Sequence, residues 1–216
     1  MIRKRNAARL LGATMISFVL VSAFTPGAMR EPAPGDLPDV TERVEAPHPL
    51  RPFEDTLLNT SRLTPVSPLE IDSETLWLAR AIYSETKRPE EQILVAWVIR
   101  NRVETAFRGK RTYKDVVLDP YQFSAFLTNS SERPFYLSLK PSSSAPGWQR
   151  TLHIAYSIRH LNGNYRPFSP RTRHFYSERS MKEGLAPTWV EGRMPLDMAP
   201  ILTIDQKRFR FYEGIS

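Results

Sequence analysis

The sequence predicts a mainly α-helical domain of the α+β class, with a small β element at its C-terminal end. Three segments between residues 73 and 162 carry apolar residues at helical spacing, which is typical of amphipathic or buried helices. Beyond Gly163 the pattern changes to short apolar and alternating runs, as expected for strands. A hydrophobic content of 41% allows a packed core, and many of the 19 prolines are concentrated in residues 31–72, outside this domain.

The first helix is expected from residue 73 to about residue 86. Asp72 or Ser73 can cap its N-terminus, because short polar side chains accept hydrogen bonds from the free N–H groups of the first turn. Its apolar residues are dense enough to predict burial on most sides. They are Leu76, Trp77, Leu78, Ala79, Ala81, Ile82 and Tyr83.

A second helix is expected to begin at Pro89 and to end near Arg108-Gly109, because proline and the acidic residues after it favour a first turn. A third helix is expected from about Trp148 to Asn162. Gly163 follows this helix and is a natural stop, since glycine readily adopts the backbone conformation that ends helices.

The segment between the second and third helices, residues 113–146, contains several prolines and predicts short helical pieces and loops. Three later segments are expected to be short strands because they are apolar or alternate between apolar and polar residues. These segments are residues 174–176, 202–204 and 208–212.

Residues 1–30 have the layout of a secretory signal. A basic start is followed by a mostly apolar, uncharged run, and small residues at Ala23 and Ala28 offer cleavage points. The alternative is a retained membrane anchor, because the uncharged residues 10–29 could just span a bilayer. In both cases the rest of the chain is expected to work outside the cytoplasm, in the periplasm or cell envelope.

Residues 31–72 are expected to form an extended, semi-rigid tether to a domain at residues 73–216. The segment is acidic, with three basic and nine acidic residues, and lacks a sustained helical or strand period. The alternative is a stretch that wraps the domain surface. Its prolines are Pro32, Pro34, Pro38, Pro47, Pro49, Pro52, Pro65 and Pro68.

The net charge of +7 comes mainly from the domain. A basic domain suits nucleic acid, anionic lipid or the carboxylate-bearing cell wall, and charge alone does not choose among them. The absence of cysteine excludes disulfides, cysteine-based zinc sites and a lipoprotein anchor. The four histidines show no metal-binding spacing; His153 and His160, for example, lie seven residues apart. We therefore expect no metal and no other cofactor.

Glu85 is the candidate acid of the domain. It follows Leu78, Ala81 and Ile82 by seven, four and three residues, which places it on their apolar stripe of the first helix. Burial raises the pKa of a carboxyl group and keeps it protonated near neutral pH, as a general acid requires. The alternative is a solvated side chain or one paired with Lys87 or Arg88.

Three blocks of sequence, in order, resemble the spore-cortex-lytic-type cell wall hydrolases. They are residues 78–85 (LARAIYSE), residues 92–103 (QILVAWVIRNRV) and residues 121–125 (YQFSA). The third helix and the later aromatic residues fit the family more loosely, and the resemblance covers about residues 74–213.

The resemblance implies a lysozyme-like helical fold and cleavage of peptidoglycan between N-acetylmuramic acid and N-acetylglucosamine. It implies that Glu85 is the catalytic acid/base of a lytic transglycosylase, which uses one glutamate. The protein is then expected to be a monomer that acts on peptidoglycan and not on nucleic acid.

Five further residues are candidates for substrate binding: Tyr83, Ser84, Gln122, Ser124 and Tyr176. Loop polar groups such as those of Gln122 and Ser124 can meet the acetamido groups of a sugar. The alternatives are turn hydrogen bonds for these two residues, core packing for Tyr83 and strand packing for Tyr176. A second catalytic carboxylate would have to be Glu104, Asp115 or Asp119, and none is convincing from the sequence.

The sequence also departs from the family pattern. The connection after Glu85, residues 86–89, is shorter than is usual and has no glycine, and residues 177–180 replace an Asn-Pro. Arg210 stands where a histidine is usual. These departures keep open a non-catalytic, wall-binding or scaffolding protein on the same fold. A nucleic-acid binder rests on the basic charge alone.

Overall fold

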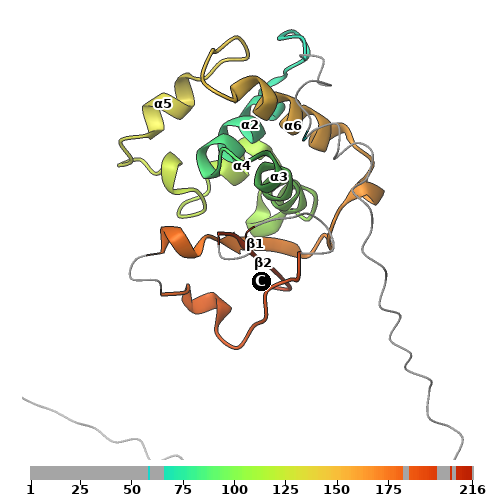
Figure 1. The fold of residues 1–216 in the computed structure, drawn as a ribbon, viewed down its shortest axis with the longest axis vertical. Helices are drawn as coiled ribbons and strands as arrows, with labels where there is room; N and C mark the ends of the chain where they lie inside the picture. Colours follow the sequence, from blue (N-terminus) through green and yellow to red (C-terminus); the bar gives the residue numbers. More distant parts are fainter. Residues whose placement is uncertain (1–57, 59–65, 182–184, 199–204, 206–207, 216) are drawn as a thin grey trace, which may run out of the picture. The chain divides into compact units, whose positions relative to one another are not determined.

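The computed structural model describes residue 58 and residues 66–181, 185–198, 205 and 208–215. The prediction of a mainly helical α+β domain with a small C-terminal β element is confirmed, and the arrangement is consistent with a lysozyme-like fold. Figure 1 shows the helices grouped together, with the two-stranded sheet on one side of them. The predicted signal, most of the predicted tether and the expected strand at residues 202–204 lie outside the described residues.

Helix α2 (Ser73–Glu85) begins at Asp72, whose side chain accepts a hydrogen bond of 2.8 Å from the backbone N–H of Thr75. The same carboxylate pairs with Arg159 of α6 (Trp148–His160). Of the two caps that the sequence allowed, Asp72 is therefore the one used. Burial of Leu78, Ala81 and Ile82 follows the predicted dense apolar face.

Asp72→Ala is expected to lower the free energy of unfolding at pH 7 by about 1 kcal/mol, because the cap is lost. Partial burial raises the pKa of Asp72, but hydrogen bonds from Arg159 and Thr75 outweigh this and lower the pKa from 3.8 to about 2. The stabilisation is therefore present above pH 3.8 and lost as pH falls through about 2. Urea unfolding at pH 7 and pH 2 checks this, with Ser73→Ala as the control that should change little.

Helix α3 (Pro89–Glu104) is the central helix, and its residues from Glu91 to Ile99 are all buried. The α-helix stops at Glu104, so the predicted end near Gly109 is wrong. Ala106 and Arg108 have φ of 47° and 54°, in the left-handed region, and this breaks the helix before a short 3-10 turn, η2 (Phe107–Gly109).

The predicted short helical pieces between α3 and α6 are confirmed. They are α4 (Tyr113–Val117), η3 (Ser124–Phe126) and α5 (Arg133–Ser138). Helix α6 packs against α2 and α3 and ends at His160, two residues before the predicted end. A buried hydrogen bond of 3.0 Å from Gln92 to the hydroxyl of Thr151 joins α3 to α6.

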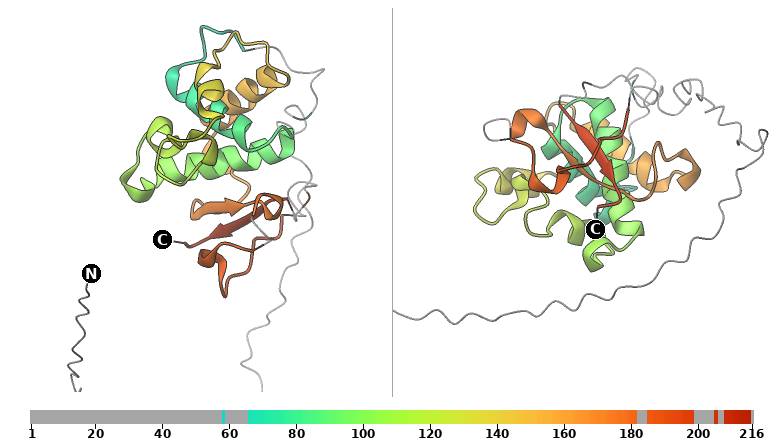
Figure 2. Two further views of the ribbon diagram at one scale, coloured as in Figure 1. Left: turned by 90° about the vertical axis from the view of Figure 1, so that its left-hand side faces the viewer. Right: turned by 90° about the horizontal axis from the view of Figure 1, so that it is seen from below.

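The sheet consists of β1 (Thr172–Tyr176) and β2 (Arg210–Glu213), which pair antiparallel with Phe175 opposite Phe211. It lies beside α3, as the left view of Figure 2 shows. The side chain of Asn101 on α3 donates to the carbonyl of Thr172 at 2.9 Å, so the C-terminal part of α3 is bonded directly to the start of β1. In the part of the chain that the structure describes, no helix is long and apolar enough to cross a membrane.

Candidate active site around Glu85

Glu85 is the last residue of α2, and the chain leaves the helix at Thr86 in an extended conformation. The carbonyl of Thr86 accepts a hydrogen bond of 2.8 Å from Gln92, and its hydroxyl donates to Glu91 at 2.5 Å. Glu91 is buried and forms an ion pair of 2.9 Å with Arg208. The short connection without glycine is thus held by buried polar contacts with α3. These contacts fix the position of the C-terminal end of α2, where Glu85 lies.

The carboxyl group of Glu85 has a pKa raised from 4.5 to about 7. Desolvation by the surrounding protein raises it, and the positive charge of Arg102 lowers it. The side chain is half-buried, so it is crowded by protein atoms and still reaches solvent. The protonated acid is therefore still present near neutral pH, and a pKa in this range suits a group that first donates and then accepts a proton.

The positive charge that acts on the pKa of Glu85 belongs to Arg102, which is buried. Its Nε donates to the carbonyl of Arg173 at 2.7 Å, and its guanidinium lies 5.5 Å from the ring centre of Phe123. Desolvation lowers the pKa of Arg102 to about 10, while the charges of Glu85 and Asp119 raise it. Arg102 therefore remains a cation at neutral pH, and its Nη1 has no hydrogen-bond partner among the described residues.

Aromatic rings also surround the end of α2. The pKa of Tyr136 is raised by desolvation and, among other charges, by that of Glu85, and Tyr136 meets Tyr83 edge to face at 6.3 Å. Lys87 lies over the ring of Tyr83, with Nζ 3.3 Å from its centre, and donates to the carbonyl of Tyr83. Among the described residues neither Lys87 nor Arg88 forms an ion pair with Glu85, unlike the alternative that the sequence left open.

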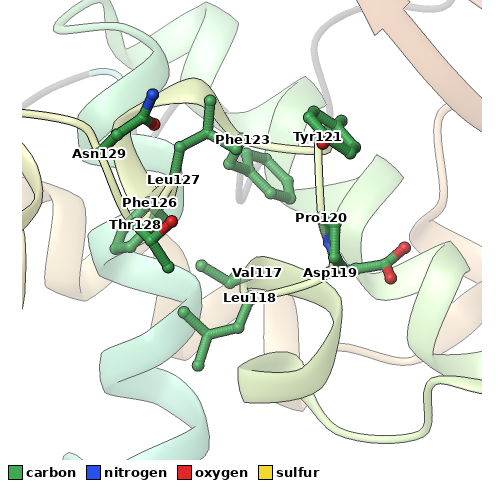
Figure 3. A pocket seen from close by; sticks show the side chains of 10 residues that line it. All are labelled: Val117, Leu118, Asp119, Pro120, Tyr121, Phe123, Phe126, Leu127, Thr128 and Asn129. Carbon is green, nitrogen blue, oxygen red and sulfur yellow. The ribbon is translucent and has the colours of Figure 1, made fainter.

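A pocket of about 520 Å³ opens between the end of α4 and the loop that carries η3. Figure 3 shows its ten lining residues: Val117, Leu118, Asp119, Pro120, Tyr121, Phe123, Phe126, Leu127, Thr128 and Asn129. Two of them connect it to the surroundings of Glu85, since Phe123 faces Arg102 and the ring of Phe126 lies 6.0 Å from that of Tyr136.

Tyr121 stands out at this pocket because its side chain is 88% exposed. Its φ of 64° is in the left-handed region, which is uncommon for a tyrosine and costs conformational energy. An exposed aromatic ring held by a strained backbone beside a pocket is a candidate platform for a sugar ring. Tyr121 lies in the block of residues 121–125 that resembles the family, but neither its exposure nor its backbone angle can be predicted from that motif.

The predicted substrate-binding residues fall into three groups. Tyr83 is buried, and its hydroxyl donates to the carbonyl of Pro146 at 2.9 Å. The hydroxyl of Ser84 donates to the carbonyl of Ala81 at 2.7 Å, so both residues make contacts within the protein. Gln122 and Ser124 lie in the loop that borders the pocket; Gln122 is half-buried and Ser124 is exposed. Tyr176 packs in the small cluster at the sheet, stacked on Tyr212 and edge to face with Trp189.

The three carboxylates considered as partners of Glu85 have other surroundings. Glu104 pairs with Arg100 at 2.6 Å and with Arg166. Asp115 is exposed in the first turn of α4. Asp119 is buried and pairs with Arg108 at 2.6 Å. No group of three or more potential metal-ligating side chains is found within the described ranges.

These features define a mainly helical domain with an acid of near-neutral pKa at the end of a buried helix. A family model described as Cell Wall Hydrolase matches residues 86–209, more than half of the chain. The protein belongs to this cell wall hydrolase family, whose members act on peptidoglycan and typically work outside the cytoplasm. No curated protein and no solved structure matches the chain. The family match begins one residue after Glu85, so it bears on the domain and not on the role of this glutamate.

Proposed function

We propose that the protein cleaves peptidoglycan strands between N-acetylmuramic acid and N-acetylglucosamine, with Glu85 as the single acid/base. The observation that carries this proposal is the state of Glu85: half-buried, free of ion pairs with described side chains, and with its pKa raised to about 7. A surface glutamate with an ordinary pKa is almost wholly ionised at neutral pH and cannot donate a proton to a glycosidic oxygen.

In the proposed reaction the protonated carboxyl of Glu85 gives its proton to the glycosidic oxygen as the bond from this oxygen to C1 of the muramic acid breaks. The resulting carboxylate then accepts the proton of the 6-hydroxyl of the same sugar while that oxygen bonds to C1. The products are a free 4-hydroxyl on one fragment and a 1,6-anhydro end on the other, and Glu85 recovers its proton. Arg102 stabilises the carboxylate between the two steps.

The one-carboxylate mechanism is supported by the surroundings of the other acids. A hydrolase with two carboxylates needs a second one about 5–9.5 Å from the first. Glu104 is engaged in ion pairs with Arg100 and Arg166, and Asp115 is exposed on α4. Asp119 pairs with Arg108 and lines the pocket, but its charge is not among those that shift the pKa of Glu85. On these grounds we propose transglycosylation rather than the addition of water.

The glycan is proposed to run from Glu85 along the pocket between α4 and η3, with Gln122 and Ser124 as polar contacts and Tyr121 as a stacking platform. Phe123 and Phe126 form part of its apolar wall. Tyr83 and Ser84 hold the last turn of α2 in place, and Tyr176 supports the sheet that contacts α3. A contact of Tyr176 with substrate stays a prediction.

Tyr121→Asn is expected to raise the KM for solubilised glycan strands about tenfold with little change in kcat, because a stacking surface is lost while asparagine tolerates the left-handed backbone. Steady-state kinetics check this. Tyr165→Asn, which removes another exposed tyrosine from a turn outside the pocket, is the matched control. An unchanged KM in the first variant contradicts the platform.

The direct test of the function is digestion of purified sacculi by the full-length protein, followed by mass spectrometry of the soluble products. Release of fragments with 1,6-anhydro ends supports the proposal. Reducing ends in their place would show hydrolysis, and sedimentation with sacculi without release would favour the wall-binding alternative.

A further inference from the structure

Three arginines lie on adjoining elements: Arg102 on α3, Arg108 in η2 and Arg173 on β1. Arg193, from a later turn, acts with them on His174 of β1, and we call these four arginines the basic cluster. The ring of Phe107 is the common contact of two of them. The guanidinium of Arg173 lies 4.7 Å from its centre and that of Arg102 lies 5.9 Å away. His174 meets the same ring edge to face at 5.2 Å.

The other two arginines of the cluster are exposed. Arg108 follows Phe107 in η2, and Arg193 lies on the turn after η7 (Thr188–Val190), whose Trp189 contacts His174 at 5.3 Å. The pKa of His174 is lowered to about 4 by desolvation and then by all four arginines. His174 is thus neutral at pH 7 and adds no charge, and its surroundings carry a concentrated positive potential.

The basic cluster holds more positive charge than the described carboxylates neutralise. Arg108 pairs with Asp119 at 2.6 Å, and this carboxylate also lies 3.7 Å from Lys110. Within the described ranges, Arg102, Arg173 and Arg193 form no ion pair. Like charges held together repel and destabilise a fold, so such a cluster is typical of a site for an anion.

Unpaired buried nitrogens point the same way. Nη1 of Arg102 and Nε of Arg173 are buried N–H donors that have no hydrogen-bond partner among the described residues. Several other arginines have an unpaired Nε, so the terminal Nη1 of the buried Arg102 is the more telling of the two. The charges of Glu85 and Asp119 act on Arg102, but neither carboxylate is hydrogen-bonded to it. A buried cation without a hydrogen-bonded counter-ion is costly, and a bound anion would lower this cost.

We propose that the basic cluster is a subsite for a carboxylate of the peptidoglycan, next to the proposed catalytic centre. The carboxylate binds the exposed guanidinium groups of Arg193 and Arg108 and approaches Arg173, while the buried Arg102 contributes positive charge. The charge of Arg102 also acts on Glu85, so this arginine links the subsite to the proposed acid. Guanidinium groups suit this ligand because they bind carboxylates with two parallel hydrogen bonds. The proposal rests on the proposed function for the identity of the polymer.

Binding is tested with the full-length protein carrying Glu85→Gln, so that the wall is not digested. Sedimentation with protein-free sacculi is compared before and after their carboxylates are converted to neutral amides. Arg193→Glu is expected to weaken binding to native sacculi about tenfold and to leave binding to amidated sacculi unchanged. Lys140→Glu makes the same change of charge at an exposed position between α5 and α6. This variant should bind native sacculi as well as the protein that carries Glu85→Gln alone.

After native and amidated sacculi, a third binding substrate shows which carboxylate of the peptidoglycan is bound. Glycan strands stripped of their peptides retain the lactyl carboxylate of muramic acid, so a persistent defect of Arg193→Glu assigns the subsite to this group. Loss of the defect assigns it to the peptide stem. Equal weakening on native and amidated sacculi, or an equal effect of Lys140→Glu, overturns the subsite. A wild type that cleaves nothing, with carboxylate-dependent binding intact, would reject the enzymatic function and leave the subsite standing.

Discussion

Glu85→Gln is expected to lower the rate of sacculus digestion at pH 6 by about a hundredfold or more, because an amide cannot supply the proton that the leaving oxygen needs. The substitution keeps the size of the side chain and removes only its acidity. Release of soluble fragments from labelled sacculi, measured as an initial rate, gives the ratio of the two proteins.

Glu90→Gln is the matched control for this result. Glu90 lies in the first turn of α3, five residues from Glu85. Its substitution also removes one carboxylate, but outside the proposed site. Its digestion rate should stay within about twofold of the wild type, as expected for a surface substitution. Equal rates for wild type and Glu85→Gln would remove Glu85 from the mechanism while leaving the family assignment untouched.

The pKa of Glu85 also predicts how activity depends on pH. Activity requires the protonated carboxyl and should fall as pH rises through about 7, without an acid limb from this group. Because its folded pKa lies above the ordinary 4.5, Glu85 stabilises the fold below pH 4.5, and this contribution is lost as pH rises through about 7. Glu85→Gln should therefore raise the thermal midpoint at pH 8 relative to the wild type, and not at pH 4.

Arg102→Met is expected to lower kcat by about ten- to a hundredfold and to move the alkaline limb of activity above pH 7. The first effect follows because the carboxylate formed at Glu85 loses a stabilising charge that is already in place before reaction. The second follows because Arg102 lowers the pKa of Glu85, so its removal lets desolvation raise that pKa further. A kcat profile from pH 5 to pH 9 measures both.

Arg102→Lys keeps the charge and is the companion variant. Its alkaline limb should lie closer to that of the wild type than the limb of Arg102→Met does. Lysine cannot, however, reproduce the planar guanidinium beside Phe123. Thermal unfolding of both variants separates loss of fold from loss of charge. A folded Arg102→Met protein whose alkaline limb does not move would show that Arg102 has a structural role only.

The sequence by itself determined the helices and the position of the candidate acid. The apolar spacing of α2 and the cap at Asp72 are local features, and they predict both the helix and the side on which Glu85 lies. The end of α3 was predicted too late. Nothing in the composition of residues 105–109 indicates that Ala106 and Arg108 adopt the left-handed region, which is unusual for both residue types.

Only the tertiary structure decided what surrounds Glu85. Arg102 is seventeen residues from Glu85 along the chain, and its approach depends on the packing of α3 against β1 and on the bond to Arg173. The contact of Glu91 with Arg208, which supports the turn after Glu85, joins residues 117 positions apart. Local patterns predict which face of a helix is apolar. The pKa of a carboxyl group depends on which atoms from distant segments displace water around it, and that is fixed only when the chain folds.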